Sequence, residues 1–326
     1  MRELLICQED FSIAGAFAIS RGTKTQARVV VCEIEEDGRC GRGECVPYAR
    51  YGETVDSVSD AIERVKREIF GGADRARLQT LLPAGAARNA IDCALLDLET
   101  KLSGKPAHEI LDLAAAAPVP TAYTISLDTP ERMAQAALRA REYGLLKLKL
   151  GGDGDPERVA AVRASAPDAK LIVDANEAWN ERSLYPNTGA CLKAGVLLIE
   201  QPLPQADDEL LRGFISPVPL CADESCHTRV SLTDLAGKYQ ILNLKLDKAG
   251  GITECLALAR EAKALGFGLM LGCMVSSSLG IAPMMLLAGM ADFVDLDGAA
   301  LLSRDREHGL RYQDGMVYPP DRQLWG

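Results

Sequence analysis

A recurrence of short apolar runs is the feature that most constrains the fold of this 326-residue chain. Beyond about residue 118, eight such runs have polar ends spaced by 22 to 27 residues, near positions 126, 149, 174, 200, 223, 245, 272 and 295. Helical patterns, such as 130–143 and 252–265, lie between the runs. Eight strand–helix units of similar length predict an α/β fold with a closed parallel barrel. An open doubly wound sheet is the alternative, but residues 151–154 (GGDG) lack the spacing of its nucleotide-binding turn.

The first part of the chain has a different pattern. Two runs rich in Val and Ile, ELLICQ and ARVVVCEIEE, predict strands. Three helical stretches follow them, near residues 55–69, 75–82 and 86–102. Strands followed by helices predict a small α+β domain. We expect three parts: an α+β domain at 1–115, the barrel at 116–310, and a C-terminal segment at 311–326 that returns to the first domain.

Composition and charge restrict the class of function. The chain is 48% hydrophobic and has a net charge of −10, and it contains no Lys/Arg run, which argues against a nucleic-acid or membrane partner. The opening MRELLICQEDF has too short an apolar run for a signal peptide. The uncharged stretch 264–291 includes three serines, five glycines and a proline, so it predicts a strand, a polar loop and a buried helix. We therefore expect a cytoplasmic protein with a small-molecule substrate.

Ten cysteines raise the question of disulfides or a zinc site. They include no Cys-x-x-Cys pair, and most lie inside apolar segments. Cys221, Cys226 and His227 come closest to a metal cluster, but a fourth ligand is missing. The thiols are therefore expected to be buried and free in a reducing cytoplasm.

Three acids stand at the ends of successive predicted strands, where the active site of such a barrel lies. Asp174, Glu200 and Asp223 would meet at one mouth. Carboxylates within ~4–6 Å of one another raise each other's pKa unless a cation neutralises them. Each acid alone fits a helix cap or a solvated loop, but three in register favour one Mg²⁺ per subunit, with Mn²⁺ as the alternative. The neighbours Asn176 and Glu224 fit either a supporting role around the metal or a helix cap.

Lysines occupy two of the other strand ends. Lys147 and Lys149 alternate along one strand and therefore face the same side, and Lys245 lies four strands further on, across an eight-stranded ring. Opposed lysines beside a metal suit removal of a proton from one face of a carbon and its return to the other. We expect the metal and a second lysine to lower their pKa. The alternatives are ordinary surface lysines, which the apolar flanks argue against, and Lys248 in place of Lys245.

Several motifs resemble the muconate-lactonizing subgroup of the enolase superfamily. They are KLKL, IVDANEAW, IEQPLP, CADESCHT and NLKLDKAGG. GECVPYARYGE and LPAGAARNAIDCALLDL also resemble the capping domain of that family, so the resemblance covers nearly the whole chain. It implies an enolase-type (β/α)7β, TIM-like barrel with an N-terminal capping domain. It also implies a magnesium-dependent reaction through an ene-diolate, as in enolase-superfamily sites generally.

The eighth strand bears on the substrate. Asp295-Leu296-Asp297 resembles the Asp-x-Asp motif with which dipeptide epimerases hold the α-ammonium group of the substrate. Two carboxylates on one strand face suit a cation, although Asp297-Gly298 also fits a simple turn. The resemblance thus implies an isomerase that epimerises a dipeptide of the L-Ala-D/L-Glu type, in cell-wall peptide metabolism. Anionic substrates without an ammonium group, such as muconate, would be repelled by this pair.

The resemblance also implies individual roles. Lys149 and Lys245 would be the acid/base pair, and Lys147 would stabilise the ene-diolate. The expected substrate-binding residues are Asp295, Asp297, Thr124 and, for a distal carboxylate, Lys24 or Arg21. Epimerases with this preference tend to carry an arginine near Lys24, and a lysine provides a point charge rather than a bidentate fork.

The alternative functions are a muconate-type cycloisomerase and a non-catalytic metal-binding relative. The expected partner is a dipeptide, with no nucleic acid and no membrane, and a homo-oligomer is compatible with the sequence.

Overall fold

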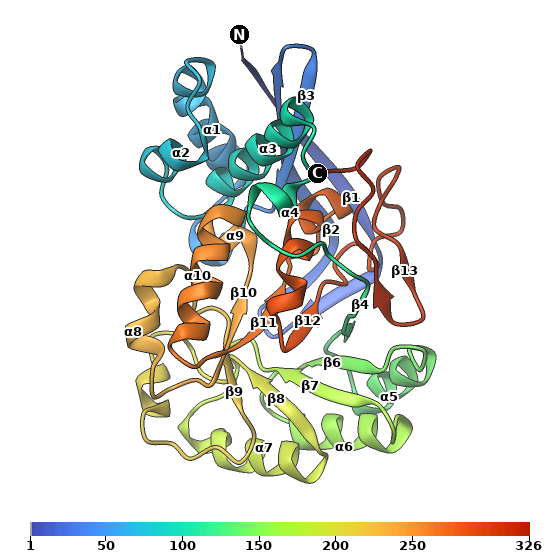
Figure 1. Cartoon of the computed structure of the whole chain (residues 1–326). Coiled ribbons are helices and arrows are strands. Elements are labelled where there is room, and N and C mark those ends of the chain that lie inside the picture. Colours follow the sequence, from blue (N-terminus) through green and yellow to red (C-terminus); the bar gives the residue numbers. More distant parts are fainter. Residues whose placement is uncertain (1) are drawn as a thin grey trace.

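The computed structural model describes residues 2–326 and places the predicted barrel below a smaller domain (Figure 1). Its eight strands are hydrogen-bonded in chain order from β5 to β12. Their bounds are β5 Tyr123–Ile125, β6 Leu145–Lys149, β7 Lys170–Asp174, β8 Val196–Glu200, β9 Leu220–Ala222, β10 Ile241–Leu244, β11 Gly268–Gly272 and β12 Phe293–Asp295. Ala122 N donates to Val294 O and so links the first strand to the last. The unbroken strand order confirms the barrel, because in a doubly wound sheet the order of successive strands reverses near the centre of the sheet.

Helical segments follow most barrel strands. The helix predicted at 130–143 ends earlier, at Arg139, and a turn leads into β6. The segments are α5 Pro130–Arg139, α6 Asp155–Ser165, α7 Glu181–Lys193, η2 Asp208–Leu211, η3 Arg229–Ser231, α8 Leu232–Leu235, α9 Leu246–Ala249, α10 Ile252–Ala264, α11 Ser278–Ile281 and η4 Ala282–Met290. Within residues 2–326, no helix combines the length and apolar character needed to cross a membrane.

The N-terminal domain is a three-stranded antiparallel sheet packed on helices. Its elements are β1 Glu3–Ile19, β2 Gly22–Glu36, β3 Arg39–Cys45, η1 Ala49–Tyr51, α1 Val55–Phe70, α2 Arg75–Leu81, α3 Ala86–Ser103 and α4 Ala107–Ile110. Strand β3 is not predicted by the sequence, because RCGRGEC lacks apolar alternation. Glycine is required there because a Cβ on Gly41 or Gly43 would lie 2.2 Å from Ala94 O or 2.1 Å from Ala90 O. This close approach holds α3 against the sheet.

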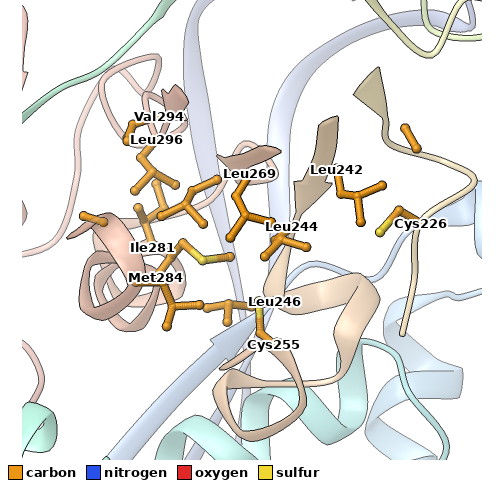
Figure 2. Close-up of a cluster of buried hydrophobic side chains, with 14 of the residues drawn as sticks. Cys226, Leu242, Leu244, Leu246, Cys255, Leu269, Ile281, Met284, Val294 and Leu296 are labelled. Atoms are coloured by element: carbon orange, nitrogen blue, oxygen red, sulfur yellow. The ribbon is translucent and has the colours of Figure 1, made fainter. Parts of the chain in front are cut away.

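Two apolar clusters define the barrel. Outward-facing strand residues pack on the surrounding helices, and Figure 2 shows part of this cluster, where side chains of β10 and β11 lie beside those of the helical segment 278–290. Inward-facing residues from successive strands form a second layer at the closed end of the barrel: Ala122, Leu145, Ile172, Leu198, Cys221, Ile241 and Met270, with Phe293 against them. We call this layer the floor. All ten cysteines carry free thiols, seven of them buried.

The C-terminal segment contacts the first domain. After β12 the chain forms β13 Tyr312–Gln313 and β14 Met316–Val317, and β14 pairs with β4 Val119–Pro120. Trp325 Nε1 then donates to Cys93 O, and Gly326 N donates to Asp97 Oδ1 at 2.8 Å. These contacts support our proposal that 311–326 is a separate segment that returns to the domain at 1–115.

Candidate active site

Three carboxylates meet at the open end of the barrel, which we call the mouth. Asp174 and Glu200 end adjacent strands β7 and β8 and pair in register, and Asp223 directly follows β9. Each offers an oxygen that lies within 4.8 Å of the other two, and all three side chains are buried. The strand-end spacing therefore brings the predicted acids together. Asp and Glu oxygens are the ligands that hard divalent cations prefer.

The protein's own cations neutralise these acids unevenly. Burial raises the pKa of Asp174, but Lys149 and Lys147 outweigh it and lower that pKa to about 2. Asp223 behaves similarly, because Lys245 and Lys248 outweigh burial and hold its pKa well below the usual range. For Glu200, burial and the negative charges of Asp174 and Asp223 prevail, and its pKa rises to about 7. A cluster with one carboxylate poorly neutralised by lysines fits a bound divalent cation.

The predicted lysines approach these acids from opposite sides. On β6, Lys149 Nζ lies 2.6 Å from Asp174 Oδ2. Across the barrel, Lys245 directly follows β10 and its Nζ lies 2.7 Å from Asp223 Oδ2. Strands β6 and β10 stand four positions apart in the eight-stranded order. Each lysine therefore pairs with a different acid of the cluster, on strands that lie four positions apart.

Lys147 lies deeper than Lys149 on the same strand face. Its Nζ is 2.6 Å from Glu200 Oε2 and 2.7 Å from Asp295 Oδ2. Burial lowers the pKa of Lys147, but the adjacent carboxylates outweigh it and the pKa stands well above the usual value. The same balance, with Asp223 as the largest opposing charge, raises the pKa of Lys245. For Lys147 and Lys245, the protein's own charges thus do not produce the lowered pKa expected from the sequence.

Two further carboxylates of the mouth come from the last strand. Asp295 ends β12 and is held by Lys147, whereas Asp297 lies two residues beyond the strand and its Oδ2 accepts a 2.6 Å hydrogen bond from Thr124 N. Burial and the charge of Asp295 raise the pKa of Asp297 to about 7. Among residues 2–326, nothing donates to the buried Asp295 Oδ1. An unpaired buried acceptor beside a second, poorly ionised carboxylate suits a ligand that brings hydrogen-bond donors or positive charge.

Two residues that hold the acids in place were not predicted from the sequence. Asn243 on β10 donates from Nδ2 to Glu200 Oε1 at 2.7 Å. Gln201 accepts on Oε1 from Asp223 N and Ser225 N. Strand alternation two residues before Lys245 is a signal that identifies Asn243 as inward-facing. No comparable local pattern marks Gln201.

Lys248, the alternative to Lys245 in the sequence, also helps to hold Asp223 in place. It lies in α9, and its Nζ donates to Asp223 Oδ1 at 2.6 Å and to Asn243 O at 2.8 Å. Two lysines therefore hold the two oxygens of one carboxylate. Because Lys248 also donates to backbone carbonyls, it is restrained more firmly than Lys245.

The N-terminal domain covers the mouth with the turn between β1 and β2. Arg21 in this turn lies 2.6 Å from Glu224 Oε1 and donates to Asn176 O at 2.8 Å. Lys24 lies over the ring of Tyr48, with Nζ 5.0 Å from the ring centroid. Neither Asn176 nor Glu224 caps a helix, because α7 is capped by Asn180 and η3 starts at Arg229. Arg21 in the turn and Lys24 at the start of β2 thus differ, since Arg21 is engaged by acids and Lys24 is not part of an ion pair among residues 2–326.

Comparison with known proteins covers both domains. Residues 1–112 match the N-terminal domain of the mandelate racemase/muconate lactonizing enzyme family, and residues 130–323 match the enolase C-terminal domain-like family. The chain is 45% identical to the L-Ala-D/L-Glu epimerase of Escherichia coli K12, across 98% of this chain and 100% of that protein. It is also 45% identical to an N-acetyl-D-glutamate racemase of Pseudoalteromonas, across 91% of this chain and 95% of that protein.

Solved structures agree with this match. An enolase family member from Agrobacterium tumefaciens, described as homologous to dipeptide epimerases and bound to sodium and L-Ala-L-Glu, superposes with a TM-score of 0.98 at 46% identity and full coverage of both chains. A dipeptide epimerase from Enterococcus faecalis, complexed with Mg and L-Leu-L-Tyr, gives a TM-score of 0.91 at 28% identity over 98% of this chain and 97% of its own. The capped barrel, the acid cluster at its mouth and these full-length matches show that the chain belongs to the mandelate racemase/muconate lactonizing enzyme family of the enolase superfamily.

Proposed function

We propose that this protein is a divalent-metal-dependent epimerase that inverts the α-carbon of the C-terminal residue in a dipeptide of the L-Ala-D/L-Glu type. The observation that carries the proposal is the pair of opposed lysines, each bonded to a different acid of the cluster. Inversion requires one group to remove a proton from one face and another to deliver a proton to the opposite face. Lys149 and Lys245 are disposed for these two tasks. The epimerase of Escherichia coli K12, at 45% identity, supports the reaction class.

Asp174, Glu200 and Asp223 are the proposed ligands of the metal, for which Mg²⁺ is the first choice and Mn²⁺ the alternative. When bound, such an ion draws electron density from the substrate carboxylate and so makes the α-proton more acidic. Lys147 lies among these acids and would donate a hydrogen bond to the developing negative charge. Asn243 and Lys248 would hold the acids in position.

The ammonium group of the dipeptide is proposed to bind Asp295 and Asp297. Asp295 Oδ1 is a buried acceptor that nothing in residues 2–326 satisfies, and a cationic ligand would favour the ionised form of Asp297. Thr124 would orient Asp297 through its backbone N–H. This arrangement would fix the position of the ammonium group relative to the acids proposed to bind the metal.

For the distal carboxylate of a glutamate side chain we assign Lys24 rather than Arg21. Arg21 already pairs with Glu224 and Glu177 and donates to Asn176 O. Burial and the charge of Arg21 lower the pKa of Lys24, and an anionic ligand would reverse this shift. The assignment predicts that Lys24→Ala weakens the binding of an Ala-Glu dipeptide more than the binding of an Ala-Leu dipeptide.

An N-acylated glutamate is the second candidate substrate. The raised pKa of Asp297 favours a neutral carboxyl group, which can donate a hydrogen bond to an acyl oxygen. The N-acetyl-D-glutamate racemase of Pseudoalteromonas at 45% identity supports this candidate. It differs from the dipeptide in one respect that can be tested, because it carries no positive charge.

Deuterium exchange tests both candidates. The protein is incubated in D₂O with Mg²⁺ and, in separate samples, L-Ala-L-Glu, L-Ala-L-Leu, N-acetyl-L-glutamate or muconate, and α-proton loss is followed by NMR. We expect the fastest exchange, with formation of the D-glutamyl diastereomer, for L-Ala-L-Glu. Faster exchange of N-acetyl-L-glutamate would select the second candidate. Turnover of muconate alone would identify a cycloisomerase, and no exchange with any compound would favour a non-catalytic relative.

A further inference from the structure

Two segments of the N-terminal domain approach the mouth, and an arginine from each contacts the same acidic residue of the barrel. The first is the β1–β2 turn that carries Arg21, and the second is the loop after β3 that contains η1 and Arg50. Arg50 Nε and Nη2 donate to the two oxygens of Glu177 at 2.8 and 2.7 Å, and Arg21 Nη1 lies 3.2 Å from Glu177 Oε2. Of the acids in residues 2–326, Glu177 alone pairs with cations of both segments.

The barrel presents Glu177 on an unusual turn that directly follows the acid Asp174. Asn176 and Glu177 have φ values of 45° and 65°, which non-glycine residues rarely adopt in succession. The turn is held by hydrogen bonds from Glu177 N to Gln201 O and from Asn176 N to Asp174 Oδ1. Strained backbone of this kind is retained where surrounding contacts favour it, and it often lies at functional sites.

The Glu177 carboxylate is well shielded although the turn lies at the rim. Its side chain is 8% exposed, compared with 27% for Arg21 and 35% for Arg50. The carboxylate also accepts a 3.0 Å hydrogen bond from Gln205 N, in the loop after β8. Four donors from three segments thus converge on one side chain. Bidentate Arg–carboxylate pairs that are largely shielded from water are stronger than exposed pairs, because they are less screened and directionally fixed.

We propose that Glu177 is a positioning residue that latches both covering segments over the mouth and thereby favours the closed, substrate-binding state. The inference rests on the proposed function for its substrate. Glu177 has no part in proton transfer. Its charge holds Arg21 and Arg50 in place, which in turn places Lys24 and Tyr48 above the substrate. A protein that spends less time closed binds substrate more weakly by the same factor, because apparent affinity scales with the fraction of competent molecules.

Glu177→Gln removes the charge with little change of shape and is the first test. With L-Ala-L-Glu and Mg²⁺ we expect KM to rise about tenfold while kcat falls by less than about threefold, because saturating substrate restores closure. Increasing KCl should raise KM of the unmodified protein more than KM of the variant. Arg50→Gln should reproduce the effect, and the double variant should be no worse than the more affected single variant. Glu209→Gln, which removes the same charge from the exposed Arg212–Glu209 pair, is the matched control.

A second measurement needs no turnover. Trypsin cleavage after Arg21, Lys24 or Arg50 in the substrate-free protein should be about tenfold faster in Glu177→Gln and unchanged in Glu209→Gln. If the unmodified protein turns over no dipeptide, the proposed function fails. The cleavage rates still decide whether Glu177 holds the two covering segments in place. Unchanged KM and unchanged cleavage would overturn the inference. So would a loss of Mg²⁺ affinity equal to the rise in KM, because that would show that Glu177 acts through the Asp174 turn.

Discussion

The floor and the mouth of the barrel are built by the same strands, yet their chemistry is opposite. On β6 the inward residues change from Leu145 to Lys147, and on β8 they change from Leu198 to Glu200. The floor is a closed apolar layer, whereas the mouth buries lysines and carboxylates that satisfy one another only in part. Two residues, about 7 Å along a strand, separate the two regions.

The difference shows how the fold divides its tasks. Apolar burial at the floor stabilises the barrel without constraining its chemistry. The like charges of the acids at the mouth cost stability, and the lysines offset this cost only in part, leaving Glu200 for a bound cation to neutralise. Substitutions at the floor should therefore change unfolding, and substitutions at the mouth should change function, with stability effects of either sign. Four variants test this contrast.

Asp223→Asn should have the largest effect. It removes a proposed metal ligand and leaves the buried Lys245 and Lys248 with one charged partner fewer. We expect loss of Mg²⁺-dependent exchange and a fall of about 3–5 kcal/mol in the free energy of unfolding, measured by urea denaturation. Asp153→Asn, at an exposed loop position, is the control. Full activity in Asp223→Asn would remove Asp223 from the metal site.

Leu198→Ala tests the floor. The side chain is fully buried in the apolar layer, so its truncation should lower the free energy of unfolding by about 2–5 kcal/mol. The KM of the folded fraction should stay unchanged, because Leu198 carries no polar group and belongs to the apolar layer of the floor. Leu192→Ala, at a residue 53% exposed, should change stability by less than about 0.5 kcal/mol. A larger effect on KM than on unfolding would contradict the division between floor and mouth.

Glu200→Gln should raise the free energy of unfolding of the metal-free protein, in contrast to the two variants above. A carboxyl group whose pKa is about 7 when folded and 4.5 when unfolded binds its proton more tightly in the folded state. The free energy of unfolding therefore falls as pH rises through this window. In EDTA at pH 8 the variant should exceed the unmodified protein by about 1–3 kcal/mol, and at pH 4 the two should be equal. With Mg²⁺ the order should reverse. A variant that is less stable than the unmodified protein in EDTA at pH 8 would show that the Glu200 charge is well neutralised without metal.

Asp297→Asn should have the smallest effect on the free energy of unfolding. It keeps an oxygen that can accept from Thr124 N but removes the charge. For L-Ala-L-Glu we expect KM to rise about tenfold or more, with the Mg²⁺ dissociation constant unchanged, because a charge-assisted hydrogen bond is lost. For N-acetyl-L-glutamate KM should change little. Equal losses of dipeptide and Mg²⁺ affinity would place Asp297 in the metal shell.

The fold was largely predictable because its period is local. Each barrel strand is one apolar run, and the strand ends at Lys149, Asp174 and Glu200 fall on the predicted positions. Strand β3 was not predicted, since its glycines are selected by the approach of α3 rather than by alternation. The shorter α5 was missed because residues 140–143 continue its pattern without continuing the helix.

The mouth was predictable where one strand carries several functional groups, as with Lys147 and Lys149. It was not predictable where a contact joins distant segments. Arg21 meets Glu224 across 203 positions of sequence, and no local pattern indicates such a pair. The roles of Gln201 and Lys248 depend on which backbone groups lie nearby, so they also required the three-dimensional structure.

The central claim is that Lys149 and Lys245 serve opposite faces of the substrate carbon. The measurement is α-proton exchange in D₂O, followed separately for L-Ala-L-Glu and L-Ala-D-Glu, with Lys149→Ala and Lys245→Ala. We predict that neither variant interconverts the diastereomers and that each still exchanges the α-proton of one of them, a different one for each variant. Retention of full epimerisation by either variant, or loss of exchange of the same diastereomer in both, would contradict the claim.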